Sequence, residues 1–267
     1  MINNIKRGFD ILIKNPRLLL PDIILLIFIL IFSGLFVFIS GVYTIIFSVN
    51  FEESLRSLIS NTPELMKVLL TLAVAALLSF ITGITTSALK YELIKNIFVN
   101  KKITFMKAFS NSKYYFLPIL YLKIATFIIY IIPLLILVLL VALFKSTILA
   151  AILIGLLLIL YIILTLAFLF RYPILFLKTK KTKEILLASY NYFKQKKAYS
   201  LLLVLSIFIV SLILSLFTTI LNILLAFAQN LGIVFTILFI LYVIIRILVN
   251  MVTSVWVSVF IFISYKK

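Results

Sequence analysis

The chain has 267 residues, of which 65% are hydrophobic and only 12% are charged. A soluble domain is about half apolar and about a quarter charged, so this composition excludes an ordinary water-soluble fold and predicts a chain largely solvated by lipid. The absence of His and Cys excludes disulfides, most zinc and haem sites, and catalysis by thiol or imidazole groups. The formal net charge is +18, so many uncompensated cations must be arranged around an apolar body.

Six apolar stretches are long enough to cross a bilayer, which requires about 20 residues. In chain order they are Leu18–Ser48, Leu65–Leu89, Phe116–Phe144, Thr147–Phe170, Ser200–Phe227 and Leu231–Ser264. Backbone groups in lipid must bond within their own segment, so these stretches are expected to be helices. Several exceed the required length, which implies tilt, a kink or a helix that continues beyond the hydrocarbon layer. We therefore predict an all-α polytopic membrane protein with a single transmembrane domain over residues 1–267.

The basic residues fall on one side of this topology. They precede the first stretch, follow the second and the fourth, and end the chain. The charged residues of the opposite side are Glu52, Glu53, Arg56, Glu64, Lys67 and Lys145. The positive-inside rule therefore places both termini in the cytoplasm, as an even number of spans requires. The expected location is the plasma (inner) membrane.

Three short amphipathic stretches suggest an internal pattern. They lie near residues 2–14, 105–118 and 184–197. In the first, Ile2, Ile5, Phe9 and Leu12 share one helical face opposite charged residues. Because two spans follow each stretch, the predicted units are 1–89, 90–170 and 171–267. Each unit is expected to be a helical hairpin preceded by a short cytoplasmic amphipathic helix, whose apolar face lies among the lipid headgroups.

No catalytic constellation emerges from the remaining polar residues. Glu52 and Glu53 are adjacent in a polar outer loop, which is typical of solvated carboxylates. The six Gly residues are scattered and form no phosphate-binding loop. Asp22 lies only near the inner end of the first stretch, so coupling through a carboxylate deep in the bilayer is disfavoured. We expect no enzymatic activity, no cofactor and no metal site.

Arg246 is the most unusual residue, because it lies about 22 Å into the last stretch. Tyr242, Arg246, Asn250 and Thr253 share one helix face. A charge at this depth is expensive and is expected to face the bundle interior or a wet cavity. Two interpretations stay open. The Arg is structural, bonding nearby oxygens or snorkelling along the helix, or the face contacts an anion or a lipid phosphate.

The basic loops also suit a lipid surface, since each Lys near anionic lipid contributes about 1 kcal/mol. The candidate headgroup contacts are Lys101, Lys102, Lys178, Lys180, Lys181 and Lys183. Nucleic acid is disfavoured because no nucleic-acid-binding fold or aromatic platform accompanies the charge. The expected partners are membrane lipids, anionic ones included, while protein partners and oligomeric state stay open.

One segment resembles a known family. It runs from Phe170-Arg171-Tyr172-Pro173 through an apolar strip and a basic linker to Glu184-Ile-Leu-Leu-Ala-Ser189-Tyr190. It is similar to a recurring segment of the membrane domain associated with glycerophosphodiester phosphodiesterases and of its stand-alone prokaryotic relatives. There, an Arg-aromatic pair ends an even-numbered span, and a helix with a Ser-aromatic pair precedes the next span. The usual Gly and Trp after that pair are replaced by Gln195, Lys196 and Lys197. The resemblance implies a fold and does not imply the phosphodiesterase activity.

We therefore expect a multi-pass membrane scaffold or accessory component that contacts lipid headgroups without catalysis. One alternative is a channel or transporter for a small anionic or amphipathic solute, with Arg246 and Asn250 lining its site. Another is a lipid-modifying membrane enzyme. A transporter should have a cavity that reaches Arg246, whereas a scaffold should have Arg246 bonded or facing lipid.

Overall fold

The structure is a computed structural model that describes residues 1–48, 50–99, 104–144, 147–227 and 232–266. Within these ranges the regular elements are all helices, and six are long and apolar enough to cross a membrane. The long helices are α2 (Leu20–Ser40), α5 (Thr62–Phe98), α7 (Phe116–Phe144), α8 (Thr147–Ala167), α11 (Lys197–Phe227) and α12 (Ile233–Lys266). The shorter elements are α1 (Ile2–Lys14), α3 (Val42–Ile46), α4 (Phe51–Ser60), α6 (Phe105–Ser112), α9 (Arg171–Leu177) and α10 (Thr182–Gln195), with 3-10 turns η1 (Pro16–Leu19) and η2 (Lys113–Tyr115). The predicted all-helical, six-span membrane class is confirmed.

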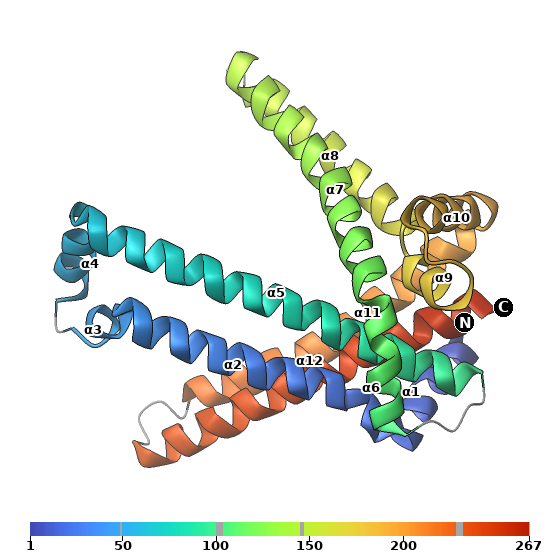
Figure 1. Cartoon of the computed structure of the whole chain (residues 1–267), viewed down its shortest axis with the longest axis horizontal. Helices are drawn as coiled ribbons and strands as arrows, with labels where there is room; N and C mark the ends of the chain where they lie inside the picture. Colours follow the sequence, from blue (N-terminus) through green and yellow to red (C-terminus); the bar gives the residue numbers. More distant parts are fainter. Residues whose placement is uncertain (49, 100–103, 145–146, 228–231, 267) are drawn as a thin grey trace.

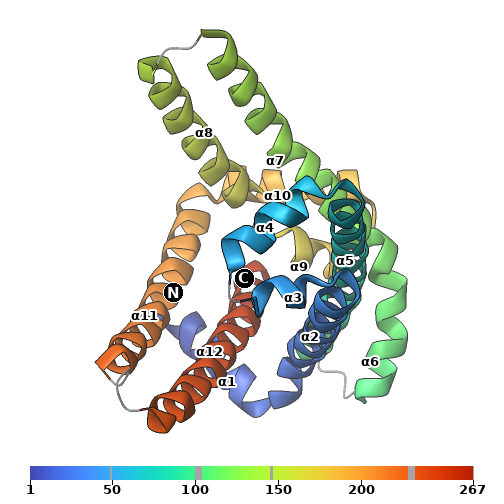
Figure 2. The same cartoon turned by 90° about the vertical axis from the view of Figure 1, so that its left-hand side faces the viewer.

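The long helices pack in three pairs. α2 lies against α5, α7 against α8, and α11 against α12. The pairs meet at one end of the molecule, near α1, α9 and α10, and diverge toward their other ends (Figure 1). Figure 2 looks at the diverging end and shows the three pairs pointing in different directions. Both termini lie at the converging end, which we call the base.

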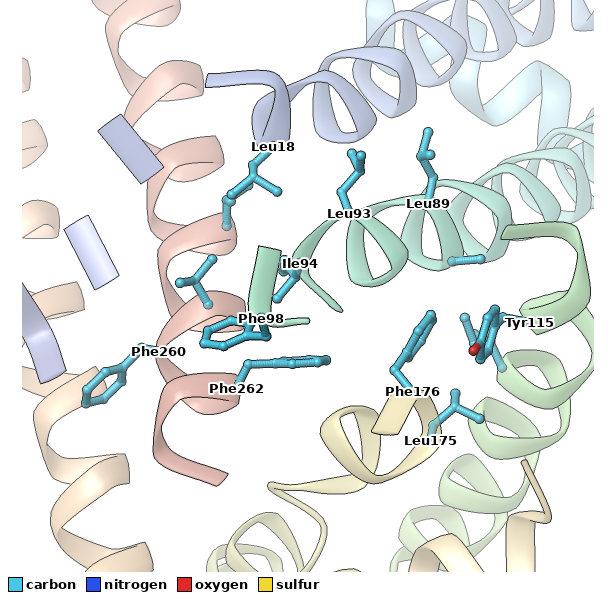
Figure 3. Packing of buried hydrophobic residues seen from close by; sticks show 14 of the residues in the cluster. Leu18, Leu89, Leu93, Ile94, Phe98, Tyr115, Leu175, Phe176, Phe260 and Phe262 are labelled. Carbon is cyan, nitrogen blue, oxygen red and sulfur yellow. The ribbon is translucent and has the colours of Figure 1, made fainter. Parts of the chain in front are cut away.

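The hydrophobic core lies in the base rather than along the spans. Figure 3 shows Phe98 of α5 near Phe262 of α12, with Phe176 of α9 beside Tyr115. In the most apolar stretch of each span, no more than 17% of the residues are buried inside the protein. Lipid must therefore cover most of the surface of the spans, which suits their composition.

A glycine and a tryptophan join α1 to α12. Gly8 is buried, and a Cβ atom at this position would lie 2.9 Å from Nε1 of Trp256. Phe9 and Phe260 stack on the same indole, with ring centres 5.1 and 5.0 Å away. The indole N–H donates to the Ile5 carbonyl at 3.4 Å. Of the apolar face of α1, Leu12 is buried and Ile5 and Phe9 are half-buried, while Ile2 stays 80% exposed. Most of this face therefore packs on protein, which differs from the expectation that it lies among headgroups.

Two other short helices of the base, α6 and α10, are only partly covered by protein. α6 packs on α5 and buries Ala108, while Met106 and Phe109 stay exposed. α10 packs on α8 and α9 and buries Ile185, while Leu187 stays exposed. Each of these helices therefore keeps apolar surface available for contact with lipid.

Two predicted span boundaries were wrong. The first helix ends at Ser40 and not at Ser48, because Gly41 adopts a left-handed φ of +77° that stops the helix before α3. The second helix does not end at Leu89 but continues to Phe98, since its last three turns are buried in the core. Lys90 and Lys95 therefore belong to a helix rather than to a basic loop.

The contact between Gly8 and Trp256 predicts that no side chain larger than hydrogen fits at position 8 without destabilising the fold. Gly8→Ala should destabilise the fold by about 1–3 kcal/mol, as overpacking of buried positions commonly does, because the neighbouring rings leave the indole no room to move. Thermal unfolding in detergent, followed by the fluorescence of Trp256, the only tryptophan of the chain, measures the effect.

Gly34→Ala is the matched control. It also lies inside a helix, but its added Cβ would meet no atom within 4 Å. It should leave stability unchanged or raise it by up to about 1 kcal/mol through helix propensity. Equal midpoints for the two variants would contradict the packing account.

Candidate functional site

An exposed basic segment joins α9 to α10 at the base. Lys178, Lys180, Lys181 and Lys183, which were expected to contact headgroups, all carry exposed side chains. The segment follows directly from α9, whose residues 173–176 are buried in the core. These four lysines therefore stand at the surface on a backbone that the core holds in place.

Hydrogen bonds of the Thr179 side chain hold the conformation of this segment. The Thr179 hydroxyl donates to Oε2 of Glu184 at 2.7 Å and accepts from the Lys181 backbone N–H at 3.3 Å. The hydrogen bonds from Thr179 and Lys181 lower the pKa of Glu184, so this carboxylate is ionised at neutral pH. Lys181 pairs with it at 3.2 Å in solvent, which is a weak interaction. The other three lysines of the segment have no carboxylate partner within the described ranges.

Aromatic rings support two of the exposed ammonium groups. Nζ of Lys180 lies 4.5 Å from the ring centre of Tyr115, and Nζ of Lys178 lies 5.5 Å from that of Tyr265. Tyr115 is itself stacked on Phe176 at 4.1 Å. A cation–π contact attracts a cation without neutralising its charge. These rings therefore position the lysines and leave their charge free to attract an external anion.

The same pattern recurs at the junction of α10 and α11. Nζ of Lys196 lies 5.2 Å from the ring centre of Tyr192. Burial beside two other tyrosines raises the pKa of Tyr192, so its hydroxyl stays neutral and donates to the Ser264 carbonyl at 3.4 Å. Lys101 and Lys102, the other expected headgroup contacts, lie outside the described residues.

A buried ion pair joins three helices beneath this surface. Nζ of Lys90 on α5 lies 2.9 Å from Oδ1 of Asp22 on α2 and donates to the hydroxyl of Ser254 on α12 at 3.1 Å. The two charged side chains are only 11% and 12% exposed. Sequence reasoning assigned Lys90 to a loop and missed this pair. The only sequence signal was an acid and a base near the inner ends of neighbouring spans.

A second buried carboxylate lies two residues beyond Lys90 on α5. Glu92 is 2% exposed, pairs with Lys95 at 3.2 Å and accepts from the Asn96 side chain at 3.3 Å. Lys95 also donates to the Tyr115 hydroxyl at 3.0 Å. Because Tyr115 lies under Lys180, this network ties the end of α5 to the exposed basic segment.

The structure leaves the polar face of α12 open. The side chains of Arg246 and Asn250 are exposed, and those of Tyr242 and Thr253 are half-buried. The Thr253 hydroxyl donates to the Val249 carbonyl of its own helix at 2.7 Å. The expectation that Arg246 faces the bundle interior is therefore not met, because α12 lies in a pair that diverges from the other spans.

Two cavities lie near the residues singled out above. One of 210 Å³ between α11 and α12 is lined by Tyr242 and by apolar side chains, and its lining does not include Arg246. Another of 560 Å³ lies where α5 meets α6 and α7, with Lys113 beside Phe109 and Phe116. Neither cavity connects Arg246 to the basic segment.

The polar groups of the described residues differ in how far they are already paired. Within the described ranges no three acidic side chains gather to hold a metal ion. The buried carboxylates of Asp22 and Glu92 are already paired with lysines. The basic segment, in contrast, presents Lys178, Lys180 and Lys183 without a carboxylate partner among the described residues, and such groups attract phosphates and other anions.

The buried ion pair predicts an asymmetric response to mutation. Asp22→Asn should cost about 3–5 kcal/mol of stability because it leaves the Lys90 charge buried and unpaired. The double variant D22N/K90M should recover much of this loss, since no buried charge remains. Thermal unfolding in detergent measures both variants.

The exposed pair provides the control for this prediction. Lys181→Gln removes the partner of Glu184 in solvent and should leave the unfolding midpoint close to that of the wild type. A loss for D22N no larger than that for K181Q would contradict the buried-pair account.

Comparison of the chain with protein-family models, with curated proteins and with solved structures finds no match. The role of the base is therefore inferred from its own geometry. In that geometry, exposed lysines lie over tyrosine rings, and buried lysine–carboxylate pairs lie in the helices of the base.

Proposed function

We propose that this chain is a multi-pass scaffold or accessory component of the membrane, without catalysis, whose base binds anionic lipid headgroups. The observation that carries the proposal is the segment from Lys178 to Lys183, in which exposed ammonium groups lie above aromatic rings next to the spans. Basic groups at the membrane surface attract anionic lipids within about a Debye length. Apolar side chains left exposed on α6 and α10, such as Phe109 and Leu187, suit the same interface.

We further propose that the base lies in the cytoplasm and that the membrane is the plasma (inner) membrane. The lysine-rich segments and both termini lie at the base, whereas Glu52 and Glu53 lie on α4 at the far end of the first pair. This charge distribution follows the positive-inside rule. In this interpretation the chain consists of three hairpins, α2–α5, α7–α8 and α11–α12, preceded by the amphipathic helices α1, α6 and α10.

The resemblance to the phosphodiesterase-associated membrane domain stays a proposal, which two contacts support. The Ser189 hydroxyl, from the Ser-aromatic pair, donates to the Ala167 carbonyl at 2.7 Å and ties α10 to the end of α8. Tyr172, from the Arg-aromatic pair, stacks on Tyr91 of α5 at 4.4 Å. Both motif elements thus have packing roles that a common fold would require.

Substitution of the basic segment tests the proposed lipid contact. The variant K178Q/K180Q/K181Q/K183Q should lower the local excess of anionic lipid at least twofold, because each Lys contributes about 1 kcal/mol at an anionic surface. The measurement is energy transfer from Trp256 to dansyl-labelled phosphatidylglycerol, relative to dansyl-labelled phosphatidylcholine, in mixed vesicles. Added salt should reduce the excess for the wild type.

The variant R56Q/K67Q is the charge control, because it removes exposed cations at the far end of the first pair. It should keep the wild-type excess. An unchanged excess in the four-lysine variant would refute the headgroup contact.

Cysteine accessibility tests the orientation, since the chain has no native Cys. Glu53→Cys should react with an impermeant maleimide added to intact cells. Lys107→Cys and Lys181→Cys should react only after permeabilisation, because all three side chains are exposed but lie on opposite sides of the proposed topology. Labelling of Lys107→Cys and Lys181→Cys from opposite sides would refute the three-hairpin arrangement.

A further inference from the structure

Basic side chains from three helices gather where the α2–α5 pair meets the α7–α8 pair. Lys90 belongs to α5 itself. Lys123 of α7 donates to the Gly83 carbonyl of α5, and Arg171 of α9 lies against Tyr172, which stacks on Tyr91 of α5. Asp22 compensates Lys90. Neither Lys123 nor Arg171 pairs with a carboxylate in the ranges that the structure describes. The junction therefore carries two uncompensated positive charges.

The ammonium group of Lys123 makes only one hydrogen bond among the described residues. It donates to the Gly83 carbonyl at 3.4 Å and lies 5.8 Å from the ring centre of Phe80. These are weak partners for a group that carries three N–H donors. The side chain is half-buried, so it is held near α5 but stays reachable from the lipid.

Arg171 is positioned by a stack of rings. Its guanidinium carbon lies 5.2 Å from the ring centre of Tyr172, and Tyr172 stacks on Tyr91 at 4.4 Å. The guanidinium is half-buried and offers five donors in a fork that matches a phosphate group. The ring stack restrains the guanidinium and leaves its edge free for an acceptor.

The lengths of α2 and α7 are consistent with a junction at the depth of lipid phosphates. At 1.5 Å per residue, α2 beyond Asp22 and α7 beyond Lys123 extend about 27 and about 32 Å toward the far end. The hydrocarbon layer is about 30 Å thick. If the far ends of these helices reach one boundary of that layer, then Asp22, Lys90 and Lys123 lie at the other boundary, where phosphate groups are found.

We propose that Lys123 and Arg171 bind the phosphate group of one anionic phospholipid, whose acyl chains cover the exposed sides of α5 and α7. Phe80 of α5 and Phe127 of α7 are exposed there and provide an apolar surface for these chains. The inference rests on the proposed contact with lipid headgroups, and it adds a single site at the junction to the diffuse attraction of the surface lysines. A free phosphate would offer the same oxygens but would leave this apolar surface uncovered.

Lipid retention tests the site. Wild-type protein, extracted in mild detergent from membranes of phosphatidylglycerol and phosphatidylcholine, should keep about one phosphatidylglycerol per chain, as measured by native mass spectrometry. K123Q/R171Q should lower this retention at least fivefold, whereas K123R, which keeps the charge at position 123 and leaves the Arg171 fork intact, should stay within twofold of the wild type. The control R56Q/K67Q removes the same charge at the far end and should retain lipid normally. Equal retention by K123Q/R171Q and wild type would overturn the proposal.

A measurement on the wild type keeps the proposal testable if K123Q/R171Q does not fold. Added phosphatidylglycerol should raise the unfolding midpoint of delipidated protein more than phosphatidylcholine does, while inorganic phosphate should have little effect. Equal shifts by the two lipids would overturn the proposal, and a shift produced by inorganic phosphate alone would assign the site to a free anion instead.

The four-lysine variant separates this site from the proposed function. It should lose the local excess of anionic lipid and still keep the single bound phosphatidylglycerol. If the four-lysine variant loses the excess while K123Q/R171Q retains lipid normally, the junction site fails and the proposed function stands. If the four-lysine variant keeps the excess while K123Q/R171Q loses its lipid, the surface contact fails and the junction site stands.

Discussion

The ion pair between Asp22 and Lys90 is the contact on which the arrangement of the first and last helix pairs depends. It joins α2 and α5, and through Ser254 it also reaches α12. A buried pair adds little net stability, because desolvation offsets much of the attraction. Loss of either partner would leave the other charge buried and unpaired, so the pair favours arrangements that keep these helices together at the base.

The divergence of the pairs follows from the two solvents that surround the chain. In lipid there is no hydrophobic driving force between apolar helices, so long spans gain little from packing on one another. In the proposed orientation the base meets headgroups and water, and there burial of apolar side chains is favourable. The aromatic stacks of Trp256 with Phe9 and of Tyr115 with Phe176 lie in this zone. The hydrophobic core is therefore concentrated at the base, where burial of apolar side chains away from water stabilises the packing.

Hydropathy alone predicted the class of the fold, because six apolar stretches in lipid have few alternatives to helices. The ends of the helices were harder to predict. Gly41 stops α2 by its backbone conformation, and the last turns of α5 are held by tertiary burial rather than by composition. Of the candidate site, the exposed lysines between α9 and α10 were predictable from charge. The partners of Lys90 and Trp256 were not, because they lie 68 and 251 residues away in sequence and become neighbours only when the helices converge.

Depth distinguishes the unpaired cations of this chain. Lys123 and the Arg171–Tyr172 pair contact α5 near Lys90 at the base, and in the proposed orientation they lie at the boundary where lipid phosphates are found. Arg246 lies eight residues beyond Ser254 on α12, about 12 Å further toward the far end at the helical rise per residue. A charge at that depth must snorkel along the helix or find a polar partner within the bilayer. The two depths therefore differ in whether a lipid headgroup can reach a cation. At the boundary it matches a lipid headgroup, whereas deeper in the layer a headgroup reaches it only if the bilayer deforms. For this reason the junction at the base, and not the more conspicuous arginine of the last span, is the better place to seek a bound lipid.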